Sequence, residues 1–220
     1  ARFTDFAALA RAQLRDVLAA WQGLGYNRRA MSMHRTAQRV VNEFNGRLPD
    51  SVEILQTFPG IGPATAGALV AFAFEQPVVF IETNIRRVFI HFFFPDRARV
   101  TDREILPLVE KTMDRGQVRT WYYALMDYGA MLPKLAPNPN RRSAHHHRQG
   151  PFLNSDRQIR GLILKALLAS THLSEEELVK IVAKQPERTE TMINLLVREG
   201  FLDRDGNQLR IASGRSPADS

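Results

Sequence analysis

Cysteine is absent from the 220-residue sequence, and lysine is scarce, since it supplies only five of the 30 basic residues. A chain without cysteine forms no disulfide, no thiolate zinc site and no cysteine-ligated iron–sulfur cluster. The other 25 basic residues are arginines, whose planar guanidinium groups suit the oxygens of phosphate groups. The composition therefore excludes a cysteine-ligated iron–sulfur cluster, and we expect that no cofactor is required.

Long apolar runs are missing as well. The longest uncharged stretch, 54–74, has the length of a membrane span, but Pro59, Gly60, Gly62 and Pro63 interrupt it. No basic segment followed by an apolar one opens the chain. We therefore expect no membrane partner and a cytoplasmic location.

The net charge of +7 is concentrated in the first two thirds of the chain. Residues 1–151 hold 20 Lys and Arg against 13 Asp and Glu, whereas residues 152–212 hold nine of each. A basic surface of this kind favours a polyanion, with nucleic acid first among the candidates. The alternative is an arginine-biased, solvated surface, and charge alone does not decide between the two.

Hydrophobic spacing predicts a mostly α-helical chain. Apolar residues recur at helical spacing in 30–44 and 117–132, and Thr101 with Glu104 forms a capping box that opens another helix. The first 132 residues contain no convincing strand and no internal repeat. Residues 133–154 are rich in Pro, His and Arg and read as a loop or linker.

Three adjacent histidines, 145–147, lie in this linker. Adjacent side chains point in different directions in most backbones, whereas metal sites draw on spaced ligands. We therefore expect no structural metal there.

The pattern of a folded module restarts at Ser155. Helices are predicted for 156–168, for a segment opened by the Ser174–Glu177 capping box, and for 186–199. An Asp-Gly turn then predicts a β-hairpin that ends at Ile211. Three helices and a hairpin indicate a winged helix over 155–212, followed by a disordered tail over 213–220. Its third helix is acidic, so we expect protein contact or packing there in preference to reading of DNA sequence.

The stretch 55–67 carries the most specific signal. A helix from Ser51 to Thr57 meets a Pro-Gly-Ile-Gly turn, and a second helix begins at Pro63. Glycine lets the backbone approach a ligand closely, and unpaired N–H groups at a helix start form an anion site. We interpret the stretch as a helix-hairpin-helix that grips a DNA phosphate, the alternative being an ordinary helical hairpin.

Four motifs in order resemble the helix-hairpin-helix (HhH-GPD) DNA glycosylases of the endonuclease III superfamily, and most closely their A/G-specific adenine DNA glycosylase branch. They are Trp21-Gln22-Gly23-Leu24-Gly25-Tyr26, the Gly-Ile-Gly hairpin, Ile81-Glu82-Thr83-Asn84-Ile85-Arg86-Arg87-Val88 and Ala124-Leu125-Met126-Asp127-Tyr128-Gly129-Ala130-Met131. The resemblance implies a glycosylase-like helical domain over 1–132, which the small winged-helix (α+β) domain follows.

The resemblance also implies roles for individual residues. The catalytic residues would be Glu82 and Asn84, and Tyr26 would be the aromatic that wedges into the base stack. The DNA-binding residues would be Tyr26, Gly60, Ile61, Gly62, Ala64, Thr65, Arg86 and Arg87. A monovalent cation would be held by backbone carbonyls of Thr57, Phe58 and Ile61.

The sequence departs from the family pattern at several places. Glu82 stands where the family has aspartate, and Ala64 stands where bifunctional members carry a Schiff-base lysine. The cysteine motif expected after Met131 is absent. The resemblance also implies a general-acid glutamate and a glutamine that fills the hole left by the flipped base, and both would precede Ala1. We therefore expect the N-terminal part of the family fold to be missing.

These observations predict a monofunctional DNA N-glycosylase of base-excision repair that acts on double-stranded DNA as a nucleoid-associated monomer. Adenine opposite 8-oxoguanine is the favoured target, while uracil, mismatched thymine and oxidised purines stay open. The alternatives are a non-catalytic DNA-binding protein on the same scaffold and, less favoured, a winged-helix regulator. The winged helix is a candidate surface for a protein partner.

Overall fold

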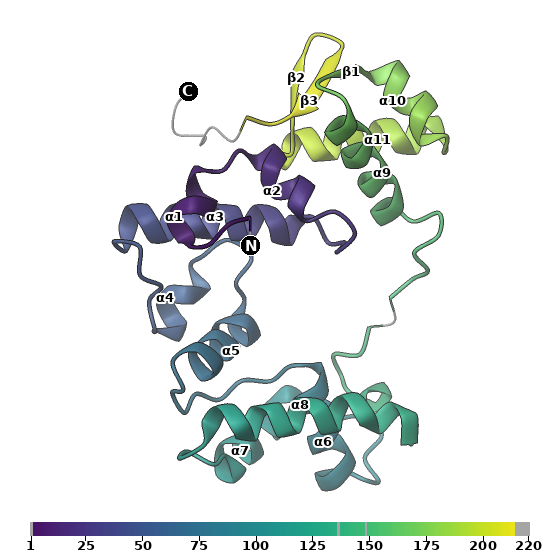
Figure 1. Cartoon of the computed structure of the whole chain (residues 1–220). Coiled ribbons are helices and arrows are strands. Elements are labelled where there is room, and N and C mark those ends of the chain that lie inside the picture. Colours follow the sequence, from purple (N-terminus) through teal and green to yellow (C-terminus); the bar gives the residue numbers. More distant parts are fainter. Residues whose placement is uncertain (1, 136, 148, 214–220) are drawn as a thin grey trace. The chain divides into compact units, whose positions relative to one another are not determined.

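The chain forms two compact units, which are described separately. A computed structural model describes residues 2–135, 137–147 and 149–213 (Figure 1). Residues 2–48 and 149–213 make up the first unit, and residues 49–135 and 137–147 the second. The first unit therefore joins the two ends of the sequence, which the order of motifs along the chain does not predict. The tail over 214–220 lies outside the described residues.

The first unit contains six helices and one small sheet within the described residues. They are α1 (Phe6–Arg11), α2 (Leu14–Ala20), α3 (Arg28–Glu43), α9 (Asp156–Ala169), β1 (Leu173–Ser174), α10 (Glu175–Val182), α11 (Pro186–Arg198), β2 (Leu202–Asp205) and β3 (Gln208–Ile211). The sheet order is β1-β3-β2, and both pairings are antiparallel. The expected helices and hairpin are confirmed, and the two-residue strand β1 was not predicted.

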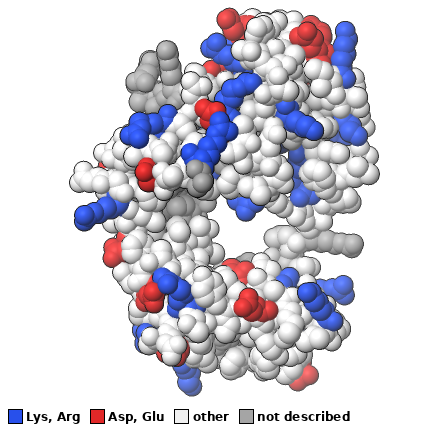
Figure 2. Space-filling view, in the orientation of Figure 1, with Lys and Arg blue, Asp and Glu red and all other residues white. Residues whose placement is uncertain are grey.

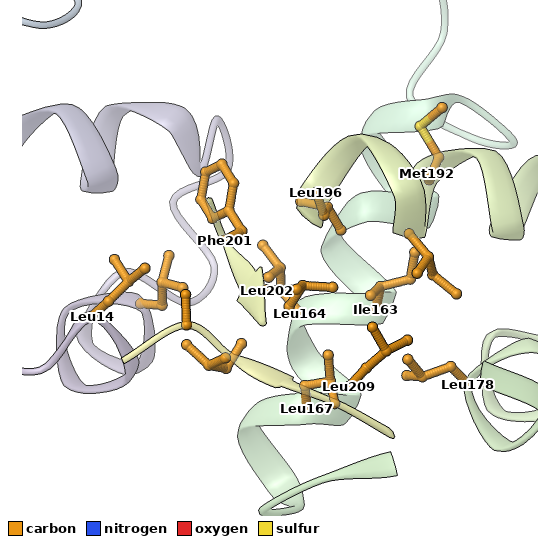
Figure 3. Packing of buried hydrophobic residues seen from close by; sticks show 14 of the residues in the cluster. Leu14, Ile163, Leu164, Leu167, Leu178, Met192, Leu196, Phe201, Leu202 and Leu209 are labelled. Atoms are coloured by element: carbon orange, nitrogen blue, oxygen red, sulfur yellow. The ribbon is translucent and has the colours of Figure 1, made fainter. Parts of the chain in front are cut away.

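One continuous apolar core holds the two sequence segments of the first unit together. Leu14 of α2 packs in the same cluster as Ile163 of α9, Leu196 of α11 and Leu209 of β3 (Figure 3). Arg15 reinforces this core, because its guanidinium donates to the carbonyls of Leu167, Leu168 and Ser170 at 2.7–3.2 Å. These carbonyls belong to the end of α9 or follow it, where helix geometry leaves them without partners.

Local signals set the ends of the C-terminal elements. Ser174 and Glu177 form the predicted capping box, since the Glu177 side chain accepts from the Ser174 N–H and the Ser174 hydroxyl accepts from the Glu177 N–H. Gly206 has a φ of +55° in the turn between β2 and β3, a region that glycine enters without a Cβ penalty.

The second unit is helical in all its regular elements that the structure describes. These elements are α4 (Val52–Gln56), α5 (Pro63–Ala73), α6 (Thr83–Phe93), α7 (Asp102–Thr112), α8 (Val118–Leu135) and the 3-10 helix η1 (Pro139–Arg142). The capping box of Thr101 and Glu104 opens α7 as predicted. The mostly helical fold class is thus confirmed.

Part of the segment 133–154, which the sequence predicts as a loop or linker, has regular structure in its described residues. Helix α8 continues past the expected end to Leu135 with Pro133 inside it, η1 follows, and Val100 pairs with Ser143 in an isolated parallel bridge. Proline removes one helical N–H but leaves the φ angle helical, so the last turn of α8 can include Pro133.

Two further expectations concern metals and membranes. No group of three His, Cys, Asp or Glu side chains placed to hold a metal ion occurs among the described residues, the histidines of 145–147 included. Within the same residues, no helix is both long and apolar enough to cross a membrane.

The second unit has an apolar core of its own, and Tyr122 places a polar hydroxyl group inside it. Its ring is fully buried and lies 4.3 Å from the Phe80 ring, centroid to centroid. Its hydroxyl donates to the Val78 carbonyl at 2.8 Å and accepts from the Phe80 N–H at 3.3 Å. Burial raises the pKa of Tyr122 to about 12. The hydroxyl therefore fixes the segment that leads into α6.

We predict that Tyr122→Phe lowers the free energy of unfolding by about 1–3 kcal/mol, because it leaves a buried carbonyl and a buried N–H without their partner. Urea unfolding followed by circular dichroism measures this. Tyr123→Phe is the matched control, since Tyr123 is half exposed, and it should change stability by less than about 0.5 kcal/mol. Equal effects of the two changes would contradict the assignment.

Candidate functional site

Glu82 is the N-cap of α6. Its Oε1 accepts from the N–H of Asn84 at 2.5 Å and from the N–H of Ile85 at 2.9 Å. A carboxylate at this place satisfies helix donors that otherwise have no partner and interacts favourably with the helix dipole. The first oxygen of Glu82 is therefore fixed, and the carboxylate is half-buried at the start of the helix.

Asn84 links this carboxylate to α8. Its Nδ2 lies 3.4 Å from the second oxygen of Glu82, and its Oδ1 accepts from Arg87 at 2.7 Å. The same nitrogen of Arg87 donates to the carbonyl of Gly129 at 3.2 Å. The amide orientation follows from these partners. Glu82, Asn84 and Arg87 therefore form one chain of hydrogen bonds that ends on α8.

Pro133 explains why the Gly129 carbonyl is available to Arg87. In a helix, the carbonyl of residue 129 accepts from the N–H of residue 133. Proline has no such N–H, so the Gly129 carbonyl takes its hydrogen bond from a side chain of α6 instead. The spacing of Gly129 and Pro133 thus creates the acceptor on which the network ends.

Gly129 also permits the closest approach between α6 and α8. A Cβ built on Gly129 would lie 2.3 Å from the Asn84 carbonyl oxygen and 2.8 Å from the Asn84 Cα. Any side chain here would displace the backbone that carries Glu82 and Asn84. Gly129 lies in the last of the four sequence motifs, but its packing role is not readable from the sequence.

Arg86 forms an ion pair with Asp102 of α7. Its Nε and one terminal nitrogen donate to the two carboxylate oxygens of Asp102, both at 2.7 Å. Burial raises the pKa of Asp102, but the hydrogen bonds and charge of Arg86 outweigh it, so the pKa lies below its ordinary value. The predicted contact of Arg86 with DNA stays a prediction, as does that of Arg87.

The segment 139–142 contacts both ends of α6. The sequence predicts this polar segment as part of a loop or linker. Asn140 is buried, and its Nδ2 donates to the Thr83 carbonyl at 2.9 Å. Arg142 donates to the carbonyls of Ile90, Phe94 and Pro95 at the end of the helix. The sequence does not predict these contacts with α6, because a Pro- and Arg-rich stretch has no hydrophobic periodicity. They are seen only in the folded structure.

The hairpin between α4 and α5 has the predicted geometry. Gly60 has a φ of +73°, and the Ile61 N–H closes the turn onto the Phe58 carbonyl at 3.2 Å. Gly62 is the N-cap of α5 and has no side chain to cap it, so the N–H groups of Ala64 and Thr65 point outward from a helix start. This arrangement fits an anion.

The cation predicted at the hairpin requires neutral carbonyl oxygens, which are ligands that monovalent cations take. The carbonyls in question belong to Thr57, Phe58 and Ile61, and the turn brings Phe58 and Ile61 within hydrogen-bonding distance of each other. The donor set is thus chemically suitable, and the site stays a prediction.

Tyr26 belongs to the first unit, whereas the other predicted site residues belong to the second. Tyr26 is 54% exposed and has a φ of +51°, an unusual backbone conformation for a tyrosine. Its hydroxyl bonds with Gln149 at 2.6 Å, and this bond lowers the pKa of Tyr26 from its ordinary value. The C-terminal segment therefore holds the side chain expected to act as a wedge.

The fold is helical, a Gly-Ile-Gly hairpin precedes α5, and a carboxylate begins the next helix, α6. This combination is typical of a class of DNA repair proteins. The chain belongs to the HhH-GPD superfamily of base excision DNA repair proteins, and the profile of this family matches residues 1–111.

Curated relatives agree with this membership, and a solved structure shares the fold. An adenine DNA glycosylase of Mycobacterium tuberculosis (strain CDC 1551 / Oshkosh) is 33% identical over 188 residues, which cover 77% of this chain and 62% of the relative. One of Mycolicibacterium smegmatis is 29% identical over 92% of this chain and 75% of the relative. The structure of a thermostable thymine-DNA glycosylase aligns with a TM-score of 0.50 and 22% identity, over 60% of this chain and 62% of that chain, and shows the shared fold. The chain thus spans 62% of the length of the mycobacterial relative named first.

We predict that Gly129→Ala lowers the free energy of unfolding by about 1–3 kcal/mol, because the added Cβ collides with the backbone of Asn84. Gly161→Ala in α9 is the matched control. A Cβ there meets nothing within 4 Å, so it should raise stability by about 0.5–1 kcal/mol. Thermal and urea unfolding measure both effects. An unchanged stability of Gly129→Ala would show that α6 and α8 do not require this contact.

Proposed function

We propose that the protein is a monofunctional DNA N-glycosylase of base-excision repair that acts on double-stranded DNA. The observation that carries the proposal is the hydrogen-bonded chain of Glu82, Asn84 and Arg87 at the start of α6. The hairpin before α5 belongs to the same unit. Membership of the HhH-GPD superfamily supports both assignments.

Glu82 would act on the sugar of the flipped nucleotide. Cleavage of the bond between C1′ and the base leaves positive charge on the sugar, and a fixed carboxylate stabilises this charge. Water then adds its oxygen to C1′ and keeps one hydrogen as the new hydroxyl group. Its other proton passes to the carboxylate or solvent, and the departing base takes up one proton, so the proton count balances. The Glu82 Oε1 is held by two backbone N–H groups, which leaves Oε2 to face the substrate. Asn84 would keep Oε2 in place.

The favoured target is adenine opposite 8-oxoguanine. The names of the mycobacterial relatives support this choice, since both are adenine DNA glycosylases. Ala64 supports hydrolysis without strand cleavage, because no lysine stands at that position to form a Schiff base. The product would then be an intact abasic strand, formed without a required cofactor.

The hairpin would bind a DNA phosphate through the outward N–H groups at the start of α5, with a monovalent cation on the carbonyls of Thr57, Phe58 and Ile61. Basic side chains are spread over the face of the molecule in Figure 2, with acidic ones between them. Phosphate contacts of this kind fix the position of DNA and carry no sequence information. We also propose that the protein associates with the nucleoid and acts as a monomer.

The C-terminal module would be a winged helix. The element order α9, β1, α10, α11, β2 and β3, with an antiparallel three-stranded sheet, supports this assignment. Helix α11 carries Glu187 and Glu190 toward its start, and such a surface is poorly suited to DNA phosphates. We therefore keep α11 as the candidate surface for a protein partner.

We predict that Gly62→Ala weakens binding of duplex DNA at least about fivefold, by a similar factor for unrelated sequences, because phosphate contacts ignore sequence. A Cβ on Gly62 meets nothing within 4 Å and its φ is −89°, so the fold should be unaffected. Fluorescence anisotropy with two labelled duplexes measures the affinity. Gly116→Ala in the same unit is the control, and affinity unchanged in Gly62→Ala would make the hairpin merely structural.

We predict that Glu82→Gln reduces base release by about 10²–10³-fold while duplex affinity stays within a few-fold, because the variant loses charge and keeps its size. Single-turnover assays on a panel of lesion-containing duplexes measure release. Glu82→Asp, which restores the family residue, should retain or raise activity. Normal turnover by Glu82→Gln would reduce Glu82 to a helix cap, worth about 0.5–2 kcal/mol. An inactive parent that Glu82→Asp activates would favour the non-catalytic DNA-binding scaffold.

A further inference from the structure

A basic pocket lies in the first unit, where residues 22–29 face helix α9. Its volume is about 910 Å³. One wall is the segment that carries Tyr26, and the other is the stripe of α9 that includes Arg157, Gly161 and Lys165. Residues spaced by three to four positions share one face of a helix, so this stripe follows a single side of α9. The family profile matches residues 1–111, so the wall formed by α9 lies outside the matched range.

The charge of the pocket is strongly positive. Five basic residues line it (Arg28, Arg29, Arg157, Arg160 and Lys165), against one acidic residue, Asp156. Glu199 neutralises part of this charge, since it pairs with both Arg28 and Arg160. Burial raises the pKa of Glu199, but these two guanidinium groups outweigh it and hold the pKa below its ordinary value.

Three cations remain without a carboxylate partner in the described part of the chain: Arg29, Arg157 and Lys165. Arg157 donates to the Gly150 carbonyl at 2.8 Å and lies 3.4 Å from the Tyr26 hydroxyl, and both partners are neutral. Lys165 is exposed. The three side chains therefore present uncompensated charge to a ligand in the pocket.

Exposed aromatic rings stand among these cations. Tyr26 is 54% and Phe152 is 61% exposed. The Arg29 guanidinium lies 5.1 Å from the centre of the Tyr26 ring, and that of Arg157 lies 6.0 Å from the centre of the Phe152 ring. Cations interleaved with aromatic rings are typical of surfaces that follow a nucleic-acid strand. A DNA strand supplies a phosphate at every nucleotide, whereas a protein partner would need acidic groups matched to the three cations.

The pocket wall is rigid. Helix α9 packs into the core of the first unit through Ile163, Leu164 and Leu167 (Figure 3). Arg15 binds the carbonyls at the end of the helix, and Gln149 holds Tyr26. Tyr26 and Arg157 are thus held in place by hydrogen bonds before a ligand binds, which lowers the entropy cost of binding.

We propose that this pocket binds a strand of DNA, with phosphates on Arg29, Arg157 and Lys165 and the sugars and bases against Tyr26 and Phe152. The proposal rests on the proposed function for its partner and adds α9 to the DNA-binding surface. The C-terminal module thus contacts DNA through the basic side chains of its first helix, while α11 adds only the apolar Met192 and Leu195 to the pocket.

The test compares two exposed lysines of the same module. Lys165 lies in the pocket on α9, and Lys180 lies on α10 outside it. Lys165→Glu and Lys180→Glu change the net charge of the protein equally. Fluorescence anisotropy with a labelled duplex at several salt concentrations gives the affinity and its salt dependence, and circular dichroism confirms that both variants fold.

We expect Lys165→Glu to weaken duplex binding at least fivefold and to reduce the slope of log K against log salt by about 0.9, the effect of one lost phosphate contact. Lys180→Glu should stay within twofold of the parent. The double variant Arg29→Ala/Lys165→Ala should reduce the slope by about twice that amount.

Equal binding by the two glutamate variants would overturn the proposal, as would a selective effect of Lys165→Glu on a captured protein with DNA binding unchanged. The outcome is separate from that of the proposed function. A parent that binds DNA through Lys165 but releases no base supports the pocket and contradicts the glycosylase. Base release with no effect of Lys165 supports the glycosylase and overturns the pocket.

Discussion

The start of helix α6 lies against α8 with no side chain between the two backbones. Gly129 makes this contact possible, since a Cβ there would fall 2.3 Å from the Asn84 carbonyl oxygen. The same residue offers its own carbonyl to Arg87, because Pro133 has no N–H to occupy it. One glycine and one proline, four residues apart, thus bring the helix that carries Glu82 to α8 and supply the last acceptor of its hydrogen-bond network.

Other side chains also fix the position of α6 through hydrogen bonds. Tyr122 fixes the segment before the helix through the carbonyl of Val78 and the N–H of Phe80. Asn140 holds the Thr83 carbonyl, and Arg142 binds the carbonyls that the end of the helix leaves open. Glu82 therefore stands on a helix whose position is constrained at both ends, as the precise placement of a catalytic group requires.

The first unit is held together by a core that two distant sequence segments share. Its N-terminal helices and its C-terminal module share one apolar core, and Arg15 joins them by hydrogen bonds to the end of α9. A small module that packs in this way gains stability from burial, and the chain has no cysteine with which to form a disulfide. The same packing places the arginines of α9 opposite Tyr26, so the C-terminal module contributes to a surface as well as to a core.

The sequence by itself determined the local structure and the candidate chemistry. Capping boxes at Thr101 and Ser174, the Asp-Gly turn and the Pro-Gly-Ile-Gly hairpin act within a few residues, so the elements they set are readable without tertiary information. The Gly-Ile-Gly turn is readable in the same way, whereas Glu82 and Asn84 are assigned because their motif resembles that of the HhH-GPD glycosylases. The role of Asn140, the contact at Gly129 and the pairing of residues 2–48 with the C-terminal module were not. Each of these depends on partners between 45 and about 150 residues away, and only the packed chain brings such partners together.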